Sequence, residues 1–379
     1  MNTKLNNKNI VISYIEKNLI TFDIDLVEAL AAGVGPDLFF LPQDLIIRHR
    51  DKVFPVPYES FSERNFKNTF VGEAELYLDS KGILAFPFTI DPLVMYYNRD
   101  ILEGAGIAQP PRFWENFFDI ASSITKYDPS LNILQSTIAF GEFQNVAQAK
   151  DILSMLLLQF GNEIVVRSGD KFKVVLNDSF NLPQSPAGAV LRFYTEFSNP
   201  TTTRGEGVYS WNKSLPNSID AFTANELAFY FGYASELFVI QQKNPNLNFD
   251  VVEIPQIKDS RFKATFGKIN ALAIAKNSQN LSTAYVVANL LTRQDFIKEL
   301  SVILSLPPAR RDLLSIKPNN PYADIFYNSA LISRGWLDPL KEATDIIFKN
   351  LVEDIVSGRL SVNESISKAD GELWLLLKN

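Results

Sequence analysis

The sequence predicts an α/β protein made of two domains, and three observations predict it. Strand-like apolar runs alternate with amphipathic helical segments along nearly the whole chain, which is typical of parallel sheets covered by helices on both faces. The 379 residues exceed the usual size of a single domain. Residues 82–107 form an apolar strand broken by Pro87, Asp91 and Pro92 and followed by an aromatic pair, which suits a strand that crosses between domains beside a ligand cleft.

The first part of the chain predicts a helix between two strands and then a strand pair. Residues 9–15 have the character of a strand. Residues 22–33 repeat apolar side chains at helical spacing, and the glycines that follow stop the helix. An apolar strand is expected at residues 38–41. Residues 73–78 and 82–88 are expected to pair around the turn between them.

The rest of the chain alternates the two element types more regularly. Proline in the first turn marks a helix at residues 111–124, a glycine ends a helix at 148–160, and a Ser-Gly-Asp turn marks a hairpin at 164–177. Further helices are expected at residues 185–196, 218–228, 281–291 and over most of the chain from 292. Further strands are expected at residues 229–232, 249–253 and 271–275.

Composition excludes several classes of function. The net charge of -7 argues against a nucleic-acid partner, because phosphate binding needs a basic surface. The chain has no cysteine, which removes disulfides, thiolate catalysis and zinc–thiolate sites. The single histidine, His49, precludes a histidine-based triad or a multi-histidine metal site, and its place beside two arginines predicts a solvated surface residue.

Motifs for cofactors and membrane segments are also missing from the sequence. There is no P-loop, nucleophile elbow or dinucleotide fingerprint, so we expect neither a cofactor nor a metal. No apolar run approaches the ~18 residues that a membrane helix needs. The first ten residues lack the apolar stretch of a signal peptide.

One ordered set of residues resembles a known family. A strand ending in proline leads through an acidic residue to Tyr-Asn-Arg-Asp, an Ala-Gly-Ile turn and Pro-Pro-x-x-Trp-Glu. The set consists of Pro87, Asp91, Tyr97, Asn98, Arg99, Asp100, Ala105, Gly106, Ile107, Pro110, Pro111, Trp114 and Glu115. It resembles the signature of the family 1 extracellular solute-binding proteins, the maltose-binding-protein type that serves ABC importers. Residues 221–232, 266–291, 308–310 and 356–361 match later family segments, so the resemblance covers nearly the whole chain.

The resemblance implies a periplasmic-binding-protein-like fold of type II, with two α/β lobes, a hinge and an interlobe cleft. Lobe 1 would comprise residues 1–88 and 268–316, and lobe 2 residues 89–267 and 317–379. The expected crossings between the lobes lie near residues 87–91, 266–270 and 313–319. Family members usually begin with one more strand and helix, so the first βα unit is expected to be absent from this chain.

Seven residues are candidates for contact with a ligand: Asp37, Asp91, Tyr97, Trp211, Tyr233, Arg310 and Trp336. A carboxylate at a lobe crossing accepts hydrogen bonds from ligand hydroxyls, and a flat ring can cover the apolar face of a sugar. Each candidate also has a plainer interpretation: turn residue for the two aspartates, core packing for the aromatic residues, solvated surface for Arg310. Trp114 and Trp374 are expected to be structural, the latter as core in the final LWLLL run.

The function implied by the resemblance is non-catalytic capture of a small solute outside the cytoplasm, above all a carbohydrate or oligosaccharide. The protein would act as a monomer and deliver its ligand to the permease of an ABC importer. A peptide, a polyamine or another solute is the alternative within this class. Two other classes stay open: a glycan-active enzyme using a carboxylate pair such as Asp91 with Glu236, and a sensor or surface interaction module on the same fold.

Overall fold

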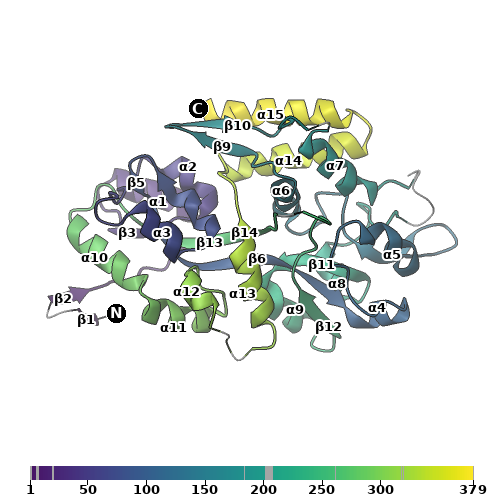
Figure 1. Ribbon diagram of the computed structural model, residues 1–379, viewed down its shortest axis with the longest axis horizontal. Helices are drawn as coiled ribbons and strands as arrows, with labels where there is room; N and C mark the ends of the chain where they lie inside the picture. Colours follow the sequence, from purple (N-terminus) through teal and green to yellow (C-terminus); the bar gives the residue numbers. More distant parts are fainter. Residues whose placement is uncertain are drawn as a thin grey trace.

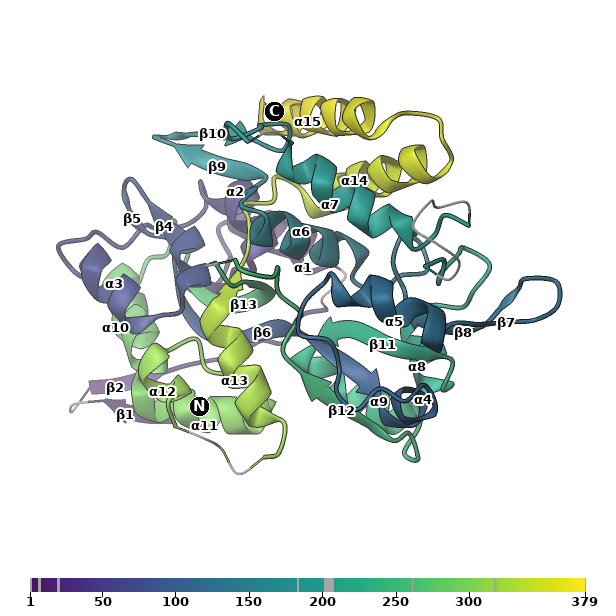
Figure 2. The ribbon, with the colours of Figure 1, turned by 45° about the vertical axis from the view of Figure 1, so that its right-hand side comes forward.

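The protein folds into two lobes that lie side by side and share a central sheet (Figure 1 and Figure 2). The computed structural model describes residues 2–5, 8–18, 21–182, 184–200, 208–260, 262–316, 318 and 320–378. Within these ranges no helix is both long and apolar enough to cross a bilayer, and no three metal-ligating side chains cluster to hold an ion. The two-lobed α/β architecture is the one that the sequence predicts.

The first lobe combines the N-terminal part of the chain with a later group of helices. Its elements are β1 (Asn2–Leu5), β2 (Lys8–Val11), α1 (Phe22–Ala31), β3 (Leu38–Phe40), η1 (Gln43–Leu45), α2 (Ile46–His49), α3 (Glu63–Thr69), η2 (Gly72–Tyr77), β4 (Leu78–Asp79), β5 (Gly82–Ile83), α10 (Leu281–Leu291), α11 (Gln294–Leu304) and α12 (Arg311–Leu314). Helices α1 and α10 begin and end close to the predicted positions.

The second lobe holds the middle of the chain and its last two helices. Its elements are α4 (Arg99–Gly104), α5 (Asn116–Ile124), β7 (Lys126–Tyr127), β8 (Ile133–Ile138), α6 (Ala149–Gln159), β9 (Val165–Ser168), β10 (Lys171–Val174), α7 (Pro186–Glu196), α8 (Ser218–Thr223), β11 (Leu227–Tyr233), η3 (Ala234–Glu236), α9 (Leu237–Lys243), β12 (Phe249–Val252), α14 (Lys341–Val356) and α15 (Val362–Lys378). The predicted hairpin at 164–177 forms as β9 and β10.

Four elements lie where the lobes meet: β6 (Ala85–Asn98), β13 (Thr265–Ile274), α13 (Ala323–Ile332) and β14 (Ser333–Arg334). They include the first two predicted crossings. Of the third, 313–319, residues 317 and 319 lie outside the described residues. The predicted lobe boundaries, 1–88 with 268–316 and 89–267 with 317–379, stay a prediction.

The shared sheet has eight strands and mixed direction, so the expectation of parallel sheets is wrong. Strand β6 pairs antiparallel with β13, β11 and β12, whereas β8 and β11 pair in parallel. The reason is that the chain leaves the first lobe along β6 and returns along β13, so these two strands run in opposite directions. Pro87 cannot donate to the ladder, and the register shift between Asn270 and Ala271 lies opposite it.

Three local predictions are also wrong. Of the strand predicted at 73–78, residues 73–77 belong to the 3-10 helix η2, which buries Glu73, Ala74 and Tyr77 and so lacks the two-residue spacing of a strand. Leu78 alone belongs to a strand, β4, which pairs with β5 around the predicted turn. The helix predicted from residue 111 begins at Asn116, after the two prolines. The helix predicted over 218–228 ends at Thr223, because its last residues already belong to β11.

The predictions for His49 and Trp374 are both wrong. Each residue lies on a helix, and its side chain points to the opposite side of the helix from the one expected. His49 is fully buried rather than solvated, and its Nε2 atom lies 2.5 Å from Asp23 in α1, which ties α2 to α1. Burial lowers the pKa of His49 although Asp23 opposes this shift. Trp374 is 46% exposed rather than core, with the Lys378 ammonium over its ring, and Leu373 faces inward instead.

The core of the second lobe is rich in aromatic rings around Trp114. This side chain is 3% exposed and packs within 6 Å, centroid to centroid, of Phe117, Phe140 and Phe231. Its indole N–H donates to Gln159 Oε1 at 2.7 Å, so its polar atom is satisfied inside the core. The structural role predicted for Trp114 agrees with this packing.

A buried carboxyl group lies where two of the lobe connections meet. Glu73 in η2 is 1% exposed, and neither carboxyl oxygen has a hydrogen-bond partner among the described residues. A Cβ atom added at Gly267 in β13 or at Gly335 after β14 would come within 2.3 or 2.7 Å of these oxygens. The neighbouring Gln43 donates its amide proton to the Gly267 carbonyl instead (2.7 Å). Burial raises the pKa of Glu73 to about 8, so the group is mostly protonated at pH 7.

We expect Glu73→Gln to flatten the pH dependence of stability. The unfolded chain releases this proton near pH 4.5 and the folded chain near pH 8, so the free energy of unfolding should fall as the pH rises between these values. The full effect is about 5 kcal/mol. Urea unfolding from pH 5 to pH 8.5 measures it. The control is Glu75→Gln, which changes a half-exposed acid of the same 3-10 helix and should keep the wild-type slope of the free energy of unfolding against pH. If Glu73→Gln also keeps that slope, Glu73 is not a buried neutral acid.

Candidate functional site

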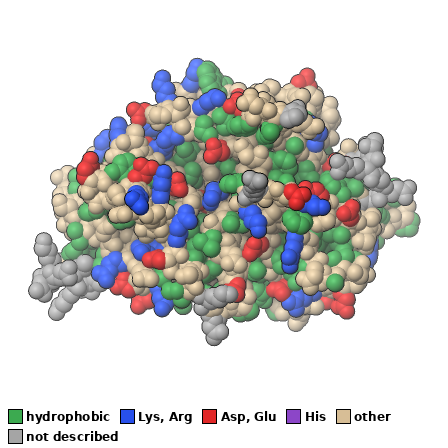
Figure 3. Space-filling view, in the orientation of Figure 1, with side chains coloured by type: hydrophobic (Ala, Val, Ile, Leu, Met, Phe, Trp, Pro, Cys, Tyr) green, Lys and Arg blue, Asp and Glu red, His purple; other side chains and the backbone are tan. Residues whose placement is uncertain are grey.

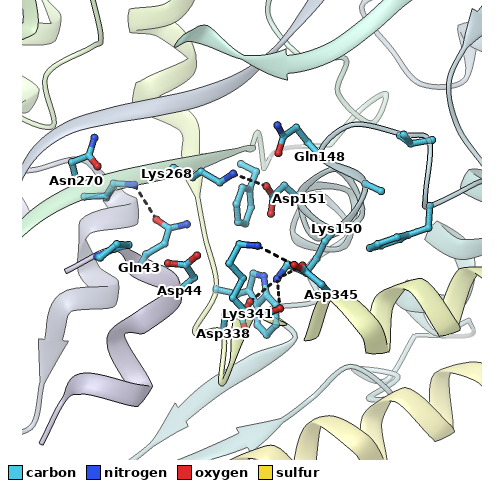
Figure 4. A pocket seen from close by; sticks show the side chains of 17 residues that line it. Gln43, Asp44, Gln148, Lys150, Asp151, Lys268, Asn270, Asp338, Lys341 and Asp345 are labelled. Atoms are coloured by element: carbon cyan, nitrogen blue, oxygen red, sulfur yellow. Dashed lines mark hydrogen bonds and ion pairs between the residues drawn. The ribbon is translucent and has the colours of Figure 1, made fainter. Parts of the chain in front are cut away.

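A cavity of about 380 Å³ lies between the two lobes (Figure 4). The first lobe contributes Pro42, just before η1, and Gln43 and Asp44 in its first turn. The second lobe contributes the first turn of α6 and the segment that leads into α14, and β13 forms the wall between them. Because every wall comes from a different element, the shape of the cavity depends on how the lobes are placed.

Seven charged side chains are part of the lining of this cavity. Its lining includes the lysines Lys150, Lys268 and Lys341 and the aspartates Asp44, Asp151, Asp338 and Asp345. Three lysines and four aspartates leave one net negative charge. The cavity is therefore polar but close to neutral, and most of its charges are neutralised by one another.

The most deeply buried of the three lysines is Lys150 on α6. Its Nζ atom lies 2.9 Å from Asp338, 2.7 Å from Asp345 and 3.0 Å from the Thr344 hydroxyl, which itself donates to Asp338. Burial alone would lower the pKa of Lys150, but the two aspartates outweigh it and raise the pKa. The cluster fastens the N-terminus of α6 to that of α14 and forms one wall of the cavity.

A second ion pair joins β13, one of the two strands that cross between the lobes, to the second lobe. Lys268 Nζ, from β13, lies 3.0 Å from Asp151 Oδ2 on α6 and 4.1 Å above the centroid of the Tyr233 ring. The Tyr233 hydroxyl donates to the same Asp151 oxygen at 2.7 Å. Burial raises the pKa of Tyr233 well above its ordinary value, so this hydroxyl keeps its proton. The arrangement fixes the Lys268 ammonium at the edge of the cavity.

Asp44 differs from the other acids of the cavity. Within the described part of the chain its carboxylate has no hydrogen bond or ion pair, and Figure 4 shows it pointing among Lys150, Lys268 and Lys341 without a contact. Burial raises the pKa of Asp44, although the three lysines oppose this shift. A partly buried acceptor without a partner is expensive unless a ligand donates hydrogen bonds to it.

Two of the seven predicted site residues lie at or directly behind the cavity. Trp336 lines it, 3% exposed and packed at 5.9 Å against Phe348. Tyr233 lies behind Asp151 and Lys268, as described above. Asp91 is placed opposite Lys268 in the β6–β13 ladder but accepts a hydrogen bond from the Ser235 amide (3.0 Å) and does not line the cavity.

The other four predicted residues lie elsewhere. Tyr97 borders a shallow groove beside α4, on the second lobe. Trp211 is fully buried, and its indole N–H donates to Asn145. Arg310 pairs with Asp312 at 2.8 Å, and Asp37 accepts a hydrogen bond from the Ser278 hydroxyl at 2.5 Å, both within the first lobe. The structure therefore does not bring these four together.

Several cavity residues were missed by sequence reasoning, namely Gln43, Asp44, Lys150, Asp151, Lys268, Asp338, Lys341 and Asp345. One local signal was available for two of them. Lys150 and Asp151 are the charged residues in the first turn of α6, and all eleven residues of this helix are buried. Charged residues in a fully buried helix need partners, which indicates a polar cluster at that end.

We expect Lys150→Met to lower the free energy of unfolding by about 3 kcal/mol or more, because it leaves Asp338 buried without a counter-ion. The double variant Lys150→Met/Asp338→Asn should lose less than the two single variants together. Urea unfolding at pH 7 of the wild type, the two single variants and the double variant measures this double-mutant cycle. Lys341→Met removes a half-exposed lysine of the same cavity and should cost under about 1 kcal/mol. If the losses in the free energy of unfolding of Lys150→Met and Asp338→Asn add up to the loss of the double variant, the buried pair is contradicted.

Comparison with known proteins assigns the chain to a family. The sequence model described as "Bacterial extracellular solute-binding protein" matches residues 21–323. A protein of Brucella abortus (strain 2308) described as a binding protein is 21% identical over 358 residues, which are 92% of this chain and 82% of the relative.

Solved structures share the fold. A cyclo/maltodextrin-binding protein complexed with maltotetraose superposes with a TM-score of 0.74 at 16% identity, covering 95% of this chain and 88% of that one. The sugar-binding protein MalE from Xanthomonas citri gives a TM-score of 0.73 at 18% identity, again over 95% and 88%. Since the family model spans most of the chain, the protein belongs to the bacterial extracellular solute-binding proteins.

Proposed function

We propose that the protein captures a short saccharide in the cavity between its lobes, without altering it chemically, and delivers it to the permease of an ABC importer. One observation carries this proposal: an interlobe cavity lined by hydrogen-bonding groups in which one carboxylate, Asp44, has no partner among the described residues. The names of the relatives support it, because the superposed proteins include a maltodextrin-binding protein and one with mannobiose bound.

The chemistry of the cavity suits hydroxyl groups. A sugar hydroxyl can donate to Asp44 and accept from Lys268 or Lys341, so neighbouring hydroxyls can satisfy both kinds of group at once. The lysines around Asp44 disfavour a cationic group there, which supports a neutral donor over a polyamine. Phe266 and Trp336 add apolar side chains to the lining, which can contact the C–H groups of a sugar ring.

The size of the cavity favours a small ligand. Ligand pockets usually measure about 300 to 1,000 Å³, and 380 Å³ lies near the lower limit. This volume supports a mono- or disaccharide rather than a long oligosaccharide. Closure of the lobes around the ligand would then present both lobes to the permease.

The assembly and the location follow from the same proposal. The protein would act as a monomer outside the cytoplasm, with its lobes divided at residues 88/89, 267/268 and 316/317. On the face in Figure 3, acidic and basic side chains are interspersed, without a large patch of one sign. Its role would be transport, with no catalytic step.

We expect a sugar from a panel of mono- and disaccharides to raise the unfolding temperature, because a ligand that binds only the folded state stabilises it. Asp44→Asn should weaken binding of that sugar about 10-fold, since it replaces a charged hydrogen-bond acceptor by a neutral one. Differential scanning fluorimetry screens the panel, and calorimetry measures the affinity.

The control is Asp37→Asn, which changes an acid on the outer side of the first lobe and should leave the affinity unchanged. The panel also contains peptides and polyamines. A response to one of these alone would reject the saccharide, and affinity that falls in Asp37→Asn but not in Asp44→Asn would reject this cavity as the site.

A further inference from the structure

A hairpin of the second lobe reaches across to the first lobe. Strands β9 and β10 pair in antiparallel register from Val165 opposite Val174 to Ser168 opposite Lys171, and the chain turns at Gly169. Figure 1 and Figure 2 show this hairpin extending from α14 and α15 toward α2, β4 and β5 of the first lobe. Its contacts with the first lobe involve none of the residues that line the cavity of the candidate site.

The base of the hairpin is fixed to the second lobe. Val165 and Val174 are buried in the core, and the Val175 amide donates to the Ile164 carbonyl at 2.8 Å. Beyond β10, the Asn177 amide donates to Asp370 of α15 at 3.0 Å. The base therefore moves with the second lobe.

The tip of the hairpin binds the turn between β4 and β5. Arg167 Nη1 lies 2.5 Å from Asp79 Oδ2, and the Ser80 hydroxyl donates to Asp170 Oδ1 at 2.6 Å. Burial tends to raise the pKa of Asp79, but Arg167 and the Lys81 amide outweigh it, so the pKa lies below its ordinary value. Tyr58 donates to the Asp79 carbonyl at 2.7 Å, which holds this turn within the first lobe.

A ring adds a third contact. Phe172 of β10 lies between two guanidinium groups, with Arg50 of the first lobe 5.2 Å and Arg167 5.4 Å from its centroid. Arg50 also donates to the Asp170 carbonyl at 3.5 Å. Stacking of a cation on an aromatic face is attractive, and here one of the two cations belongs to the opposite lobe.

We propose that the β9–β10 hairpin is a latch that holds the two lobes together without a ligand. Its base belongs to one lobe and its four described contacts reach the other, so a rotation about the hinge that separates the lobes at this end breaks all four. Polar contacts of this kind re-form readily when the lobes return. The latch therefore sets how often the empty protein opens, and with it the fraction of molecules that a ligand can enter.

Distances between the lobes test this proposal directly, on the ligand-free protein. The chain has no cysteine, so Arg64→Cys on α3 and Asn363→Cys on α15, both exposed, place one spin label on each lobe. We expect Arg167→Ala and Phe172→Ala each to shift the distance distribution measured by pulsed EPR, raising the ratio of open to closed molecules roughly five- to tenfold. Asp79→Ala combined with Arg167→Ala should open the protein no further than Arg167→Ala alone.

A variant-free measurement covers the case in which a substitution impairs folding. Raising sodium chloride to about 1 M screens partly exposed ion pairs and should open the wild type in the same direction. Lys173→Ala, on the same hairpin but paired with Asp178 of its own lobe, should behave like the wild type. Distributions that stay unchanged in high salt, in Arg167→Ala and in Phe172→Ala would overturn the latch, whatever the protein binds.

Discussion

The antiparallel pair of β6 and β13 is the constraint on which the rest of the structure depends. Both strands pass from one lobe to the other, and the apolar residues at their centre, such as Ile90 and Ile269, are part of the buried core. At this crossing Asp91 lies opposite Lys268 and Pro92 opposite Gly267. Lys268 leaves the ladder to meet Asp151 on α6, and Gly267 leaves room for the Glu73 carboxyl. Strand β13 thus supplies one charge of the cavity, Lys268, and part of the enclosure of the buried Glu73 carboxyl group.

The cavity illustrates how a polar site can be built inside a protein of modest net charge. Lys150 is held by two aspartates and a threonine, and Lys268 by an aspartate and an aromatic ring. The partners of Lys150 offset the cost of removing this lysine from water before any ligand arrives, whereas those of Lys268, which is 45% exposed, mainly orient it. A solute entering the cavity therefore meets groups that are already oriented, and Asp44 is the acceptor left for it to satisfy. The family of solute-binding proteins to which the chain belongs agrees with such a use.

Much of the fold could be predicted from the sequence because its signals are local. The apolar period of α1 and α10, the glycine after α6 and the Ser-Gly-Asp turn between β9 and β10 each involve neighbouring residues. The direction of β6 relative to β13 could not be predicted in this way, since some 170 residues separate the two strands. His49 and Trp374 show the same limit: whether a helical side chain faces inward depends on what packs against the helix, which its own neighbours do not reveal.

The candidate site was harder to predict than the fold. The sequence favoured aromatic residues in polar loops, yet Trp211 is fully buried in the second lobe, and Trp336 is the one of the seven candidates that lines the cavity. The charged residues that line the cavity look ordinary in sequence, because their partners are distant: Lys150 and Asp338 are 188 residues apart. Only the charged first turn of the otherwise buried α6 could have indicated them.

The two glycines beside Glu73 have a consequence for how the halves of the molecule are oriented. Gly267 and Gly335 lie on separate connections, and each lets bare backbone approach the same carboxyl group. A side chain at either position would have to displace this carboxyl group, which is enclosed on both sides. The separation of the two connections at this point therefore depends on one carboxyl group that packs against main chain on both sides.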